Sequence, residues 1–166
     1  MLLGLVLVPL IGASLALLLR SNRLRMALLI GVAVLHLVLV SSCWYQPPAA
    51  LLGGWLAVDA LGRVFLTLVS VLFVCAALYA VGYLQHEPRR SNRVFVGCLL
   101  GFLAAMSLVT LSQHLGLLWV AVEGTTLASA PLIYFHHSQR SLEATWKYLL
   151  ICSVGIALAL LGTFFV

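Results

Sequence analysis

Six apolar runs, each about the length of a membrane-spanning helix, occupy nearly the whole of this 166-residue sequence. A helix needs about 20 predominantly apolar residues to cross the roughly 30 Å hydrocarbon core of a bilayer. The remaining residues are too few to cover a water-soluble globule, because 8% of the chain is charged against about 25% in a typical soluble domain. Lipid is therefore the expected solvent of most side chains. The runs are Leu2–Leu19, Met26–Cys43, Leu61–Leu84, Val94–Leu111, Leu115–Phe135 and Thr145–Val166.

These runs predict an all-α fold, a polytopic transmembrane bundle of about six spans that forms a single domain over residues 1–166. Transmembrane β-strands would show about ten residues of alternating polarity, which the sequence lacks. A secretory signal carries its positive charge before its apolar segment. Here Arg20 follows the first run, so we expect that run to remain as a span. The sequence stops at Val166 inside an apolar run, which suggests the N-terminal portion of a larger protein or one half of a split one.

The basic residues between the runs predict the orientation in the membrane. Lys and Arg accumulate in cytoplasmic links. Eight of the nine lie in or next to the first, third and fifth links, whereas Arg63 lies near the second. The N-terminus is therefore expected outside. The eight residues are Arg20, Arg23, Arg25, Arg89, Arg90, Arg93, Arg140 and Lys147.

The charge and cysteine patterns argue against several classes of function. The net charge of +5 does not indicate nucleic-acid binding, because the cations are spread over links where they act as topology signals. The four cysteines are scattered without a CxxC pair, so neither a zinc nor an iron–sulfur site is expected. Nucleotide-binding glycine motifs and nucleophile motifs are also absent from the sequence. We therefore expect no catalytic residue, metal or cofactor in this chain.

Glu123 is the residue most indicative of function. It lies roughly mid-depth in the fifth run, where a charged group costs at least about 2.5–3.5 kcal/mol on insertion scales. Such a group normally faces a protein interior, a cavity or a partner, and a carboxyl held there can load and release a proton. The alternative is a structural hydrogen bond to a neighbouring helix. We favour the proton relay.

Three further ionisable residues are candidates for proton transfer, each with a structural alternative. Lys147 opens the sixth run, where a lysine can also extend to the interface. It lies too near the cytoplasmic end to pair directly with Glu123, which is about 18 Å from that end of its helix. His36, at the centre of the second run, more often represents a hydrogen-bonded packing residue. His137, beside His136 near the mouth of the fifth run, is placed to exchange protons with the cytoplasm.

The segment Trp119–Ser129, with the sequence WVAVEGTTLAS, resembles the fifth helix of the antiporter-like subunits of respiratory complex I. The same family includes the multisubunit cation/proton antiporters and the membrane-bound group 4 hydrogenases. Arg140–Leu150 and Ser153–Leu158 resemble the hydrogenase-4 component F branch most closely, and Val58–Leu61 and Tyr79–Tyr83 also fit that branch. The resemblance extends loosely over all six runs.

The resemblance implies a proton-translocating membrane subunit of a hydrogenase or an NADH-quinone oxidoreductase-like complex in the cytoplasmic (inner) membrane. Redox chemistry would then occur on other subunits. In that family the glutamate matching Glu123 pairs with a lysine on the seventh helix, which this sequence lacks. The implied partners are other membrane subunits and a continuation or partner chain that supplies this lysine. The alternatives are a cation/proton antiporter, an inorganic-carbon uptake subunit, or a truncated scaffold that moves no protons.

Overall fold

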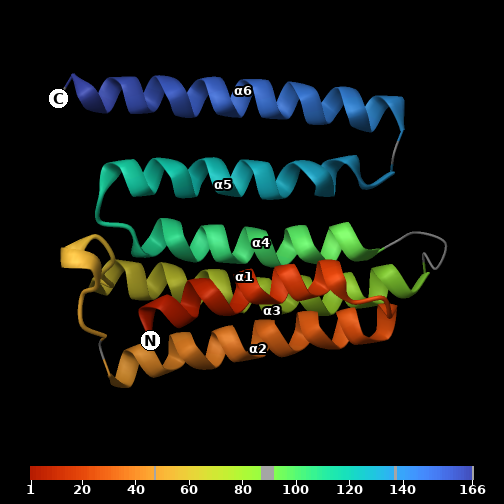
Figure 1. Ribbon diagram of the computed structural model, residues 1–166, viewed down its shortest axis with the longest axis horizontal. Coiled ribbons are helices and arrows are strands. Elements are labelled where there is room, and N and C mark those ends of the chain that lie inside the picture. The colour runs from red at the N-terminus through yellow and green to blue at the C-terminus, as the bar shows by residue number, and fades with distance from the viewer. Residues whose placement is uncertain (47, 87–91, 137, 166) are drawn as a thin grey trace.

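The computed structural model describes residues 1–46, 48–86, 92–136 and 138–165. Within these residues the chain forms six α-helices and two short 3₁₀ turns, η1 at Leu52–Gly54 and η2 at Tyr134–His136. Figure 1 shows helices of alternating direction lying side by side, with both ends of the chain at the same end of the bundle. The helices are α1 (Leu2–Leu18), α2 (Asn22–Tyr45), α3 (Ala60–His86), α4 (Asn92–Leu111), α5 (Leu115–Ile133) and α6 (Gln139–Phe164).

The predicted all-α bundle is confirmed, and each helix overlaps its apolar run. Helices α2 to α6 are long and apolar enough to cross a membrane, whereas α1 is apolar but shorter, at 17 residues. Seventeen residues rise about 26 Å, slightly less than a typical hydrocarbon core. The largest displacement is at α6, which begins at Gln139 rather than Thr145. The side chains of Ser138 and Ser141 form a capping box there, which extends the helix into polar sequence that apolarity alone does not mark.

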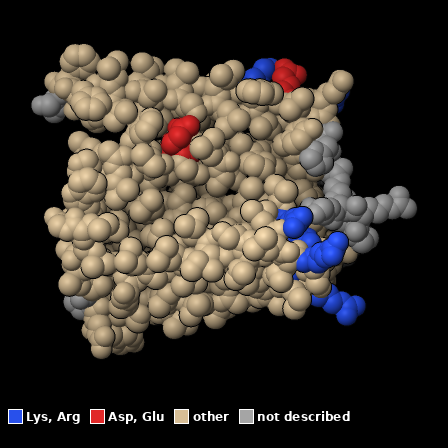
Figure 2. Space-filling model, in the orientation of Figure 1, with Lys and Arg blue, Asp and Glu red and all other residues tan. Residues whose placement is uncertain are grey.

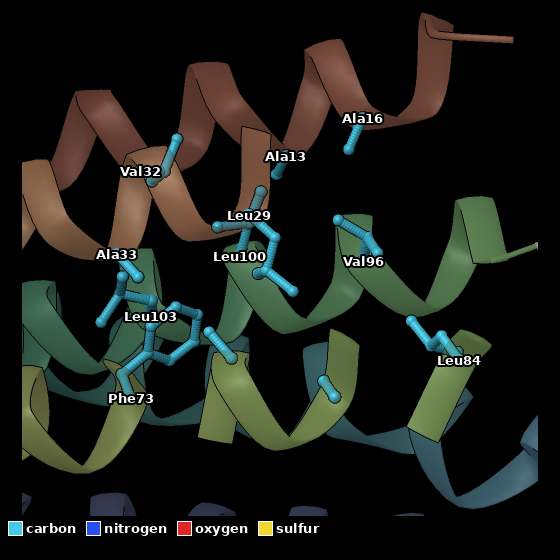
Figure 3. Packing of buried hydrophobic residues seen from close by; sticks show 12 residues of the cluster. Ala13, Ala16, Leu29, Val32, Ala33, Phe73, Leu84, Val96, Leu100 and Leu103 are labelled. Atoms are coloured by element: carbon cyan, nitrogen blue, oxygen red, sulfur yellow. The ribbon is translucent and has the colours of Figure 1, made fainter. Parts of the chain in front are cut away.

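The main hydrophobic core lies between α1, α2, α3 and α4. Figure 3 shows side chains from all four helices meeting, among them Leu29 of α2, Phe73 of α3 and Leu100 of α4. Helix α1 packs most extensively on α4, where Ala13 and Ala16 are buried. Small residues let two backbones approach closely, which is how helices associate in lipid.

Helices α5 and α6 extend the bundle to one side of this core. Helix α5 packs on α4, and α6 packs mainly on α5. No residue of α6 is buried within the described structure, although the helix is long and apolar enough to span a membrane. The face of α6 opposite α5 is therefore available to lipid or to another protein segment.

Basic side chains gather at one end of the bundle, at the right of Figure 2. Two of them cap the C-terminus of α1. Arg25 donates to the carbonyl oxygens of Leu19 (2.9 Å) and Arg20 (3.1 Å), and Arg93 Nε donates to the carbonyl oxygen of Leu17. Cations stabilise the negative end of a helix dipole and satisfy its free carbonyl groups. We call this the basic end.

The connection between α2 and α3 covers the opposite end of the bundle. Leu56 is buried and forms isolated bridges with Leu51 and with Ser112, which follows α4. The rings of Trp55 and His114 stack at a centroid distance of 4.3 Å. These contacts join the second and fourth links at one end, as the predicted alternation of spans requires.

Candidate functional site

Glu123 lies at the middle of α5 and faces α6. It is eight residues beyond the start of α5 at Leu115 and ten before its end at Ile133. Its side chain is half-buried, and Ser153 Oγ of α6 donates a hydrogen bond of 2.7 Å to Glu123 Oε1. Among the described residues no Lys, Arg or His lies within ion-pair distance of this carboxylate. A neutral hydroxyl thus solvates the charge in part but does not compensate it.

Polar side chains continue from Glu123 along α5 toward the basic end. Thr126 and Ser129 follow at three-residue intervals, so Thr126 lies beside Glu123 on the helix surface and Ser129 lies beside Thr126. Ser129 Oγ lies 2.8 Å from Tyr148 Oη of α6 and also donates to the carbonyl oxygen of Thr126. Because the serine proton is used in that bond, Tyr148 is the donor to Ser129. Hydroxyl groups thus line the α5–α6 contact on the basic side of Glu123.

The other half of the α5–α6 contact is apolar. A cavity of about 160 Å³ lies there, lined among others by Trp119, Val122 and Ile156. Cavities with such linings generally hold no water. The indole Nε1 of Trp119 is buried and has no hydrogen-bond partner in the described structure. Among the described residues, polar side chains therefore follow Glu123 toward the basic end, and mainly apolar side chains line the opposite half of the contact.

Lys147 lies in the third turn of α6 and forms an ion pair with Glu143, four residues earlier. The two side chains are 68% and 65% exposed, so solvent screens the pair and its contribution to stability is small. The structure brings Lys147 to an acidic partner at the basic end and leaves Glu123 without a cation.

His36 belongs to a separate, fully buried polar cluster. Its Nδ1 lies 2.9 Å from Ser70 Oγ of α3, and its Nε2 lies 2.9 Å from Ser107 Oγ of α4. Ser107 Oγ donates to the carbonyl oxygen of Leu103, so it must accept from His36 Nε2–H. Nδ1 then accepts from Ser70. A neutral imidazole satisfies both contacts, and the cluster joins α2, α3 and α4.

His137 lies outside the described residues, and so does the side chain of His136. None of the remaining candidates forms a hydrogen bond or ion pair with another: Glu123 meets Ser153, Lys147 meets Glu143, and His36 meets two serines. In the described part of the chain, no three His, Cys, Asp or Glu residues lie together as a metal site would require.

The sequence analysis did not identify the serines that form hydrogen bonds with His36 and Glu123. The contact between His36 and Ser107 could have been predicted from their similar depths in the membrane. His36 lies 14 residues past Asn22 and Ser107 lies 15 past Asn92, both counted from the basic end. Equal depth on helices that start at the same end makes a contact geometrically feasible. The partner of Glu123 offered no such signal, because α6 begins before its apolar run.

Comparison with known proteins adds three relatives. A hydrogenase-4 component F homolog from Methylacidiphilum infernorum is 36% identical over 118 residues, which are 68% of this chain and 25% of that protein. NADH-quinone oxidoreductase subunit L from Mycobacterium tuberculosis is 36% identical over 110 residues, 66% of this chain and 17% of the relative. A Na⁺/H⁺ antiporter subunit from Alkalihalophilus pseudofirmus is 37% identical over 108 residues, 64% of this chain and 13% of the relative.

The matched segments thus span a quarter or less of the length of these relatives. No family model matches the chain. The similarity covers about two thirds of the present sequence, so it reaches well beyond a single helix.

Proposed function

This chain belongs to the antiporter-like family of membrane subunits, and from that premise we propose that it forms a proton half-channel centred on Glu123. The half-channel would belong to a redox-driven complex of the hydrogenase or NADH-quinone oxidoreductase type in the cytoplasmic (inner) membrane. Electron transfer would take place on other subunits. This chain is a multi-pass membrane protein by its apolar helices and by its relatives.

One observation carries the proposal: Glu123 lies at mid-depth, is half-buried, and has a neutral hydroxyl as its hydrogen-bond partner. A carboxylate in such surroundings is costly unless a proton or a cation compensates it. Proton uptake and release at this position is therefore linked to whether a cation approaches. A purely structural hydrogen bond to Ser153 could be made by an amide at lower cost.

The polar residues beside Glu123 support a connection to the basic end. Six residues along a helix rise about 9 Å, so the distance from Glu123 to Ser129 requires bridging water. Tyr148 extends the route on α6. We assign Lys147 and His137 to the mouth of this route, where they would exchange protons with the cytoplasm. We assign His36 to helix packing, because both its ring nitrogens already have partners.

A continuation of the chain or a partner subunit would supply the cation for Glu123 and the rest of the channel. Two observations support this part of the proposal. Helix α6 has no buried residue, and the matched segments span at most a quarter of the relatives. In the predicted orientation the basic end faces the cytoplasm and the N-terminus lies outside.

Two other functions remain consistent with the relatives. A Na⁺/H⁺ antiporter protein is among the similar proteins, so a cation/proton antiporter, or an inorganic-carbon uptake subunit on the same fold, is the second candidate. A truncated scaffold would pack against its neighbours without moving protons.

Substitution of Glu123 tests the proposal in the assembled complex. Glu123→Gln keeps the size and hydrogen-bonding capacity but carries neither the charge nor the transferable proton. We expect proton transport into proteoliposomes to fall about tenfold or more, with insertion and assembly retained. Glu123→Asp should retain part of the activity. Glu143→Gln is the comparison variant: it removes an exposed carboxylate at the basic end and frees Lys147 from its ion pair, so a loss of transport there would report on the mouth of the route.

The outcome also separates the candidates. Transport by Glu123→Gln at the wild-type rate would disprove the relay and favour the scaffold. If Glu123→Gln is impaired, vesicles with the wild-type complex distinguish the two remaining candidates. Proton transport driven by an imposed Na⁺ gradient would indicate the antiporter, and its absence would indicate the redox-driven pump.

A further inference from the structure

Arg63 is set apart from the other cations of this chain. It lies in the first turn of α3, at the end of the bundle opposite the basic end. Its guanidinium forms no hydrogen bond or ion pair with any described residue, and its Nε is closed off from solvent without a partner. The nearest acid in sequence, Asp59, accepts a 2.7 Å hydrogen bond from the backbone N–H of Gly62 instead. Arg63 thus has several free donors at the level of the membrane interface.

Trp44, at the end of α2, holds this arginine in place. The Arg63 guanidinium carbon lies 5.6 Å from the centroid of the Trp44 ring, within the range of a cation–π contact. The ring is itself fixed, because Trp44 Nε1 donates to Thr67 Oγ1 at 3.0 Å, and Thr67 Oγ1 donates to the carbonyl oxygen of Arg63. The guanidinium is therefore preorganised, and no described residue accepts a hydrogen bond from it.

An apolar groove of about 490 Å³ begins at Trp44 and runs along α3. Its walls include Val64, Leu68 and Leu72, whose side chains are exposed. Val64 and Leu72 are eight residues apart, so the groove extends about 12 Å from the interface toward the membrane centre. The Arg63 guanidinium, which has no hydrogen-bond acceptor among the described residues, matches the phosphate group of a phospholipid. The apolar groove, which runs from the interface toward the membrane centre, matches one of its acyl chains.

We propose that Arg63, Trp44 and this groove form a binding site for one anionic phospholipid. The lipid phosphate accepts hydrogen bonds from the Arg63 guanidinium, which is shaped for bidentate contact with phosphate. One acyl chain lies in the groove against Val64, Leu68 and Leu72. Trp44 stands at the boundary, a position that its amphipathic ring favours. The preference for an anionic headgroup follows from the absence of a described carboxylate paired with Arg63.

Native mass spectrometry of the full chain, purified in detergent, tests the site. The protein is offered an equimolar mixture of phosphatidylglycerol and phosphatidylethanolamine. We expect the wild type to retain one phosphatidylglycerol in preference to phosphatidylethanolamine. Arg63→Gln should weaken this binding by about tenfold to a hundredfold, as expected for loss of charge-assisted hydrogen bonds. Leu68→Trp, which fills the groove at an exposed position and keeps the arginine, should reduce binding as well.

The control is Arg23→Gln, which makes the same charge change at an exposed residue of the basic end. We expect it to retain the bound phosphatidylglycerol, and a large excess of inorganic phosphate should not displace the lipid. Equal retention of the two lipids by the wild type would overturn the proposal. So would an equal loss in Arg23→Gln, displacement by free phosphate, or a second copy of the chain retained in place of lipid.

Discussion

At the residue scale, the polar groups inside this bundle divide into satisfied and unsatisfied ones. The ring of His36 has a partner on each nitrogen and is fully buried. Glu123 has one neutral partner and is half-buried. Satisfied buried networks fix a structure, whereas a buried charge without compensation marks a functional site. This difference between two ionisable residues is the reason for assigning them different roles.

The assignment of His36 to packing predicts the effect of its removal. His36→Ala deletes two interhelical hydrogen bonds and leaves a cavity between α2, α3 and α4. Interhelical hydrogen bonds in membranes contribute about 0.6 kcal/mol each, and large-to-small core substitutions cost about 2–5 kcal/mol. We expect the free energy of unfolding in mixed micelles to fall by about 2–4 kcal/mol, while folded protein in the complex keeps its proton transport. A variant of wild-type stability that transports no protons would instead assign His36 to the relay.

The sequence was sufficient to single out the ionisable residues at this scale, but not their partners. A glutamate or histidine in an apolar run is conspicuous because it is costly there. Serine in a membrane helix is common and inexpensive, so Ser70, Ser107 and Ser153 carried little signal. The counting of arginines predicted which links share one end. It could not predict that Arg25 and Arg93 also cap α1, because that contact depends on how α1 meets α4.

At the element scale, the helices were predictable and their packing was not. Each apolar run became a helix because lipid offers the backbone no other hydrogen-bond partners. The start of α6 was misplaced because a capping box stabilises polar residues that precede the apolar run. The connection from α2 to α3 lies between two of the six apolar runs. Its contacts with Ser112 and His114 join segments more than 50 residues apart and have no local signature.

Close packing of α1 on α4 yields a prediction about two glycines of α4. A Cβ added at Gly97 would lie 2.9 Å from Leu17 Cδ2 and 3.0 Å from Leu17 Cγ of α1, whereas one added at Gly101 meets nothing within 4 Å. Overpacking costs about 1–3 kcal/mol, and replacing a helical glycine by alanine gains up to about 1 kcal/mol.

We therefore expect Gly97→Ala to be less stable than Gly101→Ala by about 1–3 kcal/mol, measured by reversible unfolding in mixed micelles. Both variants gain the same methyl group in the same helix, so their difference isolates the contact with α1. Equal stabilities would mean that Leu17 moves aside without cost and that the α1–α4 contact does not depend on a glycine.

At the scale of the whole molecule, the described structure has a well-packed side, formed by α1 to α4, and a side where α6 is exposed. The core connects α1, α2, α3 and α4, whereas α6 contacts mainly α5 and buries none of its residues. Glu123, a carboxylate with a neutral hydroxyl as its partner, lies at the contact of these two outer helices. The unsatisfied charge and the uncovered helix thus occur on the same side of the bundle. A protein neighbour on α6 would provide both a cover and a cation.

Photo-crosslinking in the native membrane distinguishes a protein neighbour from lipid on that side. A photoreactive residue at Leu158 of α6, which is 63% exposed, is expected to capture a membrane protein of the complex or a further segment of the same protein. The same residue at Leu72 of α3, 60% exposed in the groove beside Trp44, is expected to capture phospholipid. The two positions match in residue type, exposure and apolar surroundings, so a difference between their adducts reports the neighbour and not the chemistry of the probe. Lipid adducts at both positions would make α6 a lipid-facing helix, and the half-channel would then have to obtain its cation from elsewhere.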